Sequence, residues 1–199
     1  MNDVAVSLDL YWIPLGAGER PGQRVVRFSG RVFEAIDALS DGRPRRRLFH
    51  AALVATRDSS TVYVEMAPVP DGNGRDERGV VAEGAVGASW LGRLRIFRYE
   101  VRRWSNGTIP DLSYAVDSPV RITDSPALVQ DVLDGLGEVP TPVWGRDAYG
   151  TGEMWNSNSV IAWALARLGL EEAAGVPPDG GRAPGWSSGI AAARPDHAV

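Results

Sequence analysis

Residues 49–66, FHAALVATRDSSTVYVEM, predict a β-hairpin that carries a single histidine. Two apolar runs, Phe49–Thr56 and Thr61–Met66, are separated by four mostly polar residues. A short polar connection between runs rich in β-branched residues is typical of antiparallel strands joined by a tight turn. We expect the turn to be centred between Asp58 and Ser59, and this position fixes the register of the two strands.

The expected register places a histidine and a carboxylate on one face of the hairpin. Ala52 faces Glu65 across the pair, and side chains two positions apart share a face, so His50 and Glu65 become diagonal neighbours. Tyr63 lies on the same face. A carboxylate there can accept a hydrogen bond from one imidazole nitrogen and leave the other nitrogen as a base. The alternative is a histidine with a purely structural place in a strand.

The clearest helix is predicted over Asn156–Leu168. It opens with four consecutive capping residues, Asn156-Ser157-Asn158-Ser159, and is followed by Gly169. Ser157 begins the inward-facing stripe, which places its hydroxyl at the positive end of the helix dipole, beside N–H groups that can hold an oxyanion. The same four residues are also ordinary helix caps, and both interpretations stay open. The stripe continues with Ile161, Ala164, Leu165 and Leu168.

The remaining sequence predicts further strands and two further helices. Beyond Glu171 the chain is rich in Gly, Pro and Ala, which favours one domain over 1–170 and an irregular tail over 171–199, with Trp186 as an anchor. Strands are expected over Val4–Trp12, Val25–Phe28, Gly79–Gly87 and Leu94–Val101, and helices over Val32–Leu39 and Ser125–Leu136, the latter with Ser125 as cap and Pro126 in the first position.

Composition narrows the classes of function. A net charge of −4 gives no basic surface for nucleic acid, and the absence of cysteine excludes disulfides and thiolate nucleophiles. Only His50 and His197 are histidines, so a multi-histidine metal site is not expected, and we expect no cofactor. The chain starts without a secretory signal and has no apolar run long enough to span a bilayer, which predicts a cytoplasmic protein without a membrane span.

The order of these elements resembles a known group of proteins. A strand with Phe49-His50-Ala51-Ala52-Leu53, a second strand and, far downstream, an Asn-X-Asn-Ser helix start are similar to the circularly permuted NlpC-type papain-like proteins. Lecithin:retinol acyltransferase and the PPPDE peptidases belong to that group. The resemblance, which covers about 49–168, implies a papain-like α+β fold with a mostly antiparallel sheet and a packed nucleophile-bearing helix. It also implies that His50 is the base, Glu65 its orienting residue and Ser157 the residue in the nucleophile position.

One residue departs from the family pattern, because members use cysteine where this chain has Ser157. A serine hydroxyl stays protonated and needs His50 to remove its proton during attack. The leading hypothesis is therefore a hydrolase or acyltransferase that acts on amide or ester bonds of a peptide or an acyl compound. N–H groups near Ser157, helped by Asn156 or Asn158, would form the oxyanion hole.

Two other hypotheses remain. The same fold can be a catalytically inactive binding module that lost its thiol, or the chain can be an unrelated α+β domain. Besides Tyr63, Asn156 and Asn158, the candidates for substrate binding are aromatic residues near the helix entrance, Trp144 and Trp155. Together with Arg146, Asp147 and Glu153 they form either a substrate cleft or a packed, salt-bridged loop.

Overall fold

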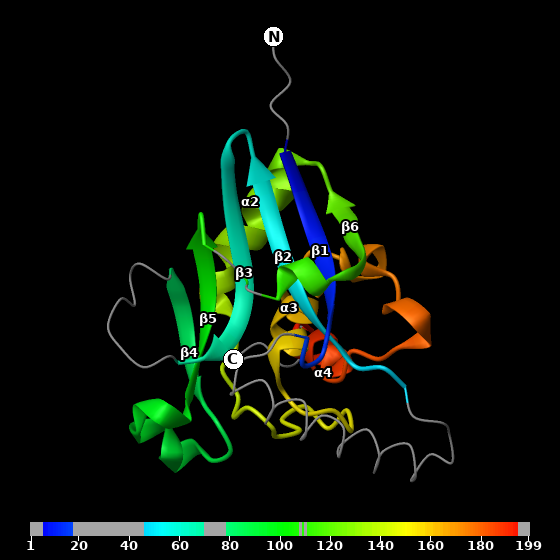
Figure 1. Cartoon of the computed structure of the whole chain (residues 1–199). Coiled ribbons are helices and arrows are strands. Elements are labelled where there is room, and N and C mark those ends of the chain that lie inside the picture. Colours follow the sequence, from blue (N-terminus) through cyan, green and yellow to red (C-terminus); the bar gives the residue numbers. More distant parts are fainter. Residues whose placement is uncertain (1–5, 18–45, 70–78, 108, 110, 195–199) are drawn as a thin grey trace.

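The computed structural model describes residues 6–17, 46–69, 79–107, 109 and 111–194 (Figure 1). In this part of the chain a six-stranded antiparallel sheet packs with three α-helices on one side, which confirms the α+β class. The strand order is β4-β5-β3-β2-β1-β6. The strands are β1 (Val6–Pro14), β2 (Phe49–Arg57), β3 (Ser60–Pro68), β4 (Val80–Ala85), β5 (Arg98–Ser105) and β6 (Val116–Thr123), and the helices are α2 (Pro126–Gly135), α3 (Ser157–Ala166) and α4 (Trp186–Ala192).

The hairpin of β2 and β3 forms as predicted. Val54 faces Tyr63, and Asp58 takes a positive φ of 52° in the turn, a conformation that Asp tolerates better than most residues. The pairing runs from the turn only as far as Leu53 and Val64, whereas β2 stays paired with β1 all the way to Phe49. The hairpin therefore opens at the end that carries His50.

The predicted strands agree with the structure to different degrees. The alternation at the N-terminus is confirmed by β1, and β4 lies within the predicted range 79–87. The strand predicted over 94–101 is shifted to β5, because residues 89–97 form two short 3₁₀ helices instead, η1 (Ser89–Arg93) and η2 (Arg95–Phe97). Alternation alone does not distinguish such turns from a strand. The sequence did not indicate β6.

Both predicted helices in the described part begin where capping chemistry placed them. Ser125 caps α2 and Pro126 occupies its first turn, while Asn156 caps α3. The expected single apolar stripe of α3 is wrong, however, because every residue from Asn158 to Leu165 is buried. The sheet covers one side of this helix and α4 covers the other. The expectations for 25–28 and 32–39 lie outside the described residues.

The C-terminal region differs from the irregular tail that its composition predicted. Its described part, up to residue 194, contains two 3₁₀ turns, η5 (Glu171–Ala174) and η6 (Pro178–Gly180), and then α4. Gly189 allows α4 to approach α3 closely, since a Cβ there would lie 2.2 Å from the Ser159 carbonyl oxygen. Trp186 packs against Trp12 with 5.2 Å between ring centroids. Small residues, which suggested a loose chain, instead allow two helices to pack tightly.

The two faces of the sheet bury different side chains. One face, under the helices, is almost entirely apolar. The opposite face carries Asp9, His50, Glu65 and Arg102, together with a small apolar cluster that includes Ile13. None of the helices in the described residues is long and apolar enough to cross a membrane.

Candidate functional site

The first turn of α3 is held by a capping box. The Asn156 side-chain oxygen accepts a hydrogen bond from the Asn158 N–H at 2.8 Å, and Ser159 Oγ accepts one from the Asn156 N–H at 3.0 Å. Ser159 Oγ also donates to the Gly185 carbonyl oxygen, and Asn156 Nδ2 donates to that of Pro184. The structure therefore confirms the capping role of this run and ties it to the segment that leads into α4.

Asn158 connects this helix start to the strand that carries the histidine. Its Oδ1 accepts a hydrogen bond from the Ala51 N–H at 2.8 Å, and its Nδ2 donates to the Phe49 carbonyl oxygen at 3.0 Å. Phe49 and Ala51 flank His50, so the Asn158 amide fills the gap where β2 and β3 separate. Two segments more than a hundred positions apart thus meet at the open end of the hairpin.

His50 is half-buried on the sheet face opposite the helices, where it pairs across the ladder with Ile13. Ile109 packs against Ile13 and Ala52 on the same face, and Leu112 and Ala115 pack against this cluster as well. Burial lowers the pKa of His50 from 6.5 to about 4, and the negative charge of Asp111 acts in the opposite direction. At neutral pH the imidazole is therefore uncharged and can accept a proton.

Glu65 shares the face with His50, as expected, but its ion-pair partner is Arg102. The two lie directly opposite each other on β3 and β5, with 3.1 Å between Glu65 Oε1 and Arg102 Nη1. Arg102 also binds Glu100 at 3.0 Å and the Pro68 carbonyl oxygen. Burial raises the pKa of Glu65, and Arg102 opposes this rise. Arg102, directly opposite Glu65, is a closer partner than His50, which is only a diagonal neighbour and lies where β2 and β3 no longer pair.

Sequence reasoning missed Arg102 and Asp111. Arg102 lies on β5 outside the strand predicted over 94–101, so its register opposite Glu65 was not visible. Asp111 lies far from His50 in sequence, and Ile109, two positions before it, packs on the same sheet face as His50. No local pattern could have paired either residue with its neighbour.

The hydrogen bonds of the cap decide which groups can still bind an oxyanion. The Asn158 N–H binds the Asn156 side chain, and the Ser159 N–H binds the Asn156 carbonyl oxygen. The Asn158 amide spends both of its donors, on the carbonyl oxygens of Phe49 and Pro184. Among the described residues, nothing hydrogen-bonds to the Ser157 N–H, which leaves it as the backbone donor nearest the Ser157 hydroxyl.

The aromatic candidates for substrate binding lie in three different settings. Trp155 is fully buried in the core, so its ring cannot line an open cleft. Trp144 packs edge-on against Tyr99, with 5.9 Å between ring centroids. Tyr63 is half-buried beside Ala52 on the polar face.

The loop before α3 is held by hydrogen bonds to two carboxylates, although residues 145–148 are exposed. Asp147 accepts hydrogen bonds from the Thr151 and Gly152 N–H groups, and Glu153 accepts them from Gly185 and Ser187. Glu153 Oε1 also lies 3.6 Å from Arg182 Nη2, and this ion pair agrees with the salt-bridged interpretation of the loop. These contacts hold the chain that enters the helix.

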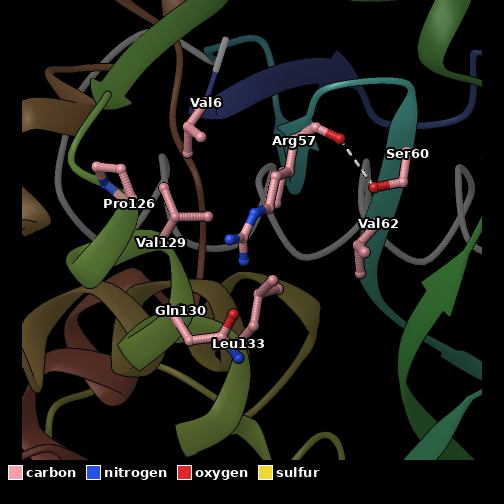
Figure 2. Close-up of a pocket in the computed structure, with 9 residues that line it drawn as sticks. Val6, Arg57, Ser60, Val62, Pro126, Val129, Gln130 and Leu133 are labelled. Carbon is pink, nitrogen blue, oxygen red and sulfur yellow. Dashed lines mark hydrogen bonds between the residues drawn. The ribbon is translucent and has the colours of Figure 1, made fainter. Parts of the chain in front are cut away.

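A separate pocket of about 130 Å³ lies between α2 and the sheet (Figure 2). Its walls are mostly aliphatic, with the Arg57 side chain extending into it. Arg57 is seven residues from His50 along β2, a separation of about 23 Å in an extended strand. This pocket therefore does not serve the site at the open end of the hairpin. It is lined by Val6, Ala55, Arg57, Ser60, Val62, Pro126, Val129, Gln130 and Leu133.

Neither a metal site in the described part of the chain nor a similarity to known proteins assigns a function to this protein. The described residues contain no group of three or more His, Asp or Glu side chains that could hold a metal ion. Comparison of the chain with family models, curated proteins and solved structures finds no match.

Proposed function

We propose that this chain has a circularly permuted papain-like fold and transfers acyl groups from amides or esters, with Ser157 as nucleophile and His50 as general base. The observation that carries the proposal is the Asn158 side chain, which binds the backbone on both sides of His50. Ser157 is the residue immediately before Asn158, so the same contact brings its backbone to the end of β2.

The order of the elements supports the same proposal. A strand histidine, a following antiparallel strand and a later buried helix with an Asn-X-Asn start occur here in the order that the permuted papain-like proteins use. The sheet packs against that helix, as such a fold requires. The proposed substrate is a peptide or an acyl compound.

The chemistry follows from the protonation states. For this step the His50 ring, which lies on the sheet face away from the helices, reaches Ser157 Oγ past the edge of β2 that β3 leaves open. There uncharged His50 takes the proton from Ser157 Oγ as the oxygen attacks the carbonyl carbon, and the Ser157 N–H donates to the developing oxyanion. The imidazolium then gives its proton to the leaving amine or alcohol, and an acyl-serine remains. Water or another acceptor, deprotonated by His50, releases the acyl group.

A fluorophosphonate probe tests this proposal, because it labels only serines that are activated as nucleophiles. We expect labelling of the wild-type chain and its loss in Ser157→Ala and in His50→Ala. Ser187→Ala is the matched control, since Ser187 is an exposed serine in the first turn of another helix. Labelling that persists in Ser157→Ala would contradict the proposal.

A second candidate is a binding module that uses the same site without catalysis. The pairing of Glu65 with Arg102 favours it, because the expected carboxylate is committed elsewhere. This candidate predicts no labelling of the wild type, together with thiol reactivity in Ser157→Cys. Labelling of the wild type that is lost in Ser157→Ala supports catalysis, whereas a wild type that is not labelled supports the binding module.

A further inference from the structure

The turns η1 and η2 form a projection between β4 and β5 (Figure 1). Three large apolar side chains are exposed on this projection. Trp90 is 69% exposed, Leu94 54% and Ile96 71%. The other large hydrophobic side chains that are exposed in the described residues, Tyr114 and Val176, are isolated in sequence. Three such residues between positions 90 and 96 form a patch of the kind that marks a binding surface.

The patch is supported by the rest of the molecule. Arg98 Nε donates to the Gly92 carbonyl oxygen within the projection, and Arg146 Nε donates to that of Gly87 at 3.1 Å. A β-bridge joins Val86 to Trp144. These contacts fix both ends of the projection and hold its apolar side chains toward solvent.

The charge of the projection is opposite to that of the whole chain. Arg93 and Arg95 are exposed and alternate with the apolar residues, and the sequence from 89 to 97 contains no Asp or Glu. The chain as a whole carries a net charge of −4. The two arginines are complementary to an anionic surface, and the apolar side chains are complementary to an apolar layer beneath it.

A bilayer fits this description better than a protein partner. A stable protein interface buries about 800 Å² on each side, far more than a few side chains on two 3₁₀ turns provide. Tryptophan and arginine both suit the membrane interface, because each joins an apolar body to a polar end. We propose that Trp90, Leu94 and Ile96 insert into the headgroup region of an anionic membrane while Arg93 and Arg95 bind its phosphate groups. This attachment is peripheral and does not depend on the proposed acyl transfer.

Vesicle co-sedimentation of the full chain tests the proposal. We expect binding to vesicles that contain phosphatidylserine, and much weaker binding to phosphatidylcholine alone. The triple variant Trp90→Ser, Leu94→Ser, Ile96→Ser is expected to bind at least tenfold more weakly. Arg93→Gln and Arg95→Gln are each expected to weaken binding about fivefold, an effect that added salt reduces.

Val176→Ser is the matched control, because Val176 is 83% exposed but lies outside the projection. Its vesicle binding should equal that of the wild type. The proposal is overturned if the wild type does not sediment with anionic vesicles, or if Val176→Ser loses as much binding as the triple variant. It is also overturned if the triple variant only converts a self-associated form to a monomer, which would assign the patch to a second copy of the chain.

Discussion

The helix-covered face of the sheet and the opposite face hold the chain together in different ways. On the first, Leu8, Leu10 and Leu53 are fully buried among other apolar side chains, and burial of such groups is favourable without any partner. On the second, Glu100 and Arg102 are almost as well buried, and the ion pair between them offsets the cost of burying their charges. The apolar face tolerates changes of size poorly, and the polar face tolerates changes of charge poorly.

The largest expected effect comes from removing Arg102, the cation that pairs with both the buried Glu100 and the half-buried Glu65. Arg102→Met leaves Glu65 and Glu100 without this partner and should lower the free energy of unfolding by about 3–5 kcal/mol. The loss should shrink at acidic pH, where the carboxylates become neutral. Denaturant titration measures both effects.

Two further variants show whether charge, rather than shape, explains that loss. Adding Glu65→Gln and Glu100→Gln to Arg102→Met should restore most of the stability. Arg103→Met should change stability by less than about 1 kcal/mol, because its pairing with Asp134 is exposed. Equal losses in Arg102→Met and Arg103→Met would remove the contrast between buried and surface pairs.

The apolar face should respond to size and not to pH. Leu165→Ala, in the middle of the buried helix α3, should lower the free energy of unfolding by about 2–5 kcal/mol at every pH where the protein is folded. Leu94→Ala, at an exposed leucine, should change it by less than about 0.5 kcal/mol. A marked pH dependence of the Leu165→Ala effect would contradict this distinction.

His50 should make stability depend on pH in a defined window. The unfolded chain binds a proton at this residue below about pH 6.5, whereas the folded chain does so only near pH 4. Between these values the unfolded state holds more protons, so stability falls as the pH falls, by on the order of 3 kcal/mol at most. His50→Gln should remove this part of the profile. An NMR titration of the His50 ring near pH 6.5 would contradict the expectation.

Loss of the contact between Asn158 of α3 and the backbone of β2 should have an intermediate effect on stability. Asn158→Ala leaves the Ala51 N–H and the Phe49 carbonyl oxygen without their partner and should destabilise the fold by about 1–3 kcal/mol. It should also abolish fluorophosphonate labelling if Ser157 is the nucleophile. Asn156→Ser, which keeps a capping oxygen, should cost less than about 1 kcal/mol. Labelling unchanged by Asn158→Ala would show that this contact does not position Ser157.

The sequence predicted the features that depend on neighbouring residues, namely the turn of the hairpin and the start of α3. The polar turn of the hairpin placed Val54 opposite Tyr63, and the four capping residues placed the start of α3 at Asn156. The partner of Glu65 could not be predicted, because it depends on the register of β5, which the turns of η1 and η2 shift along the chain. The packing of α4 was hidden for a similar reason: Gly189 indicates flexibility in isolation and close approach only beside α3.

The Asn158 side chain occupies the position that a neighbouring strand would fill. The Ala51 N–H is therefore hydrogen-bonded to a side chain of α3. Its protection from solvent exchange depends on a helix side chain and not on the sheet ladder. Exchange at this single amide should therefore report the undocking of α3 while the amides of the β1–β2 ladder remain protected.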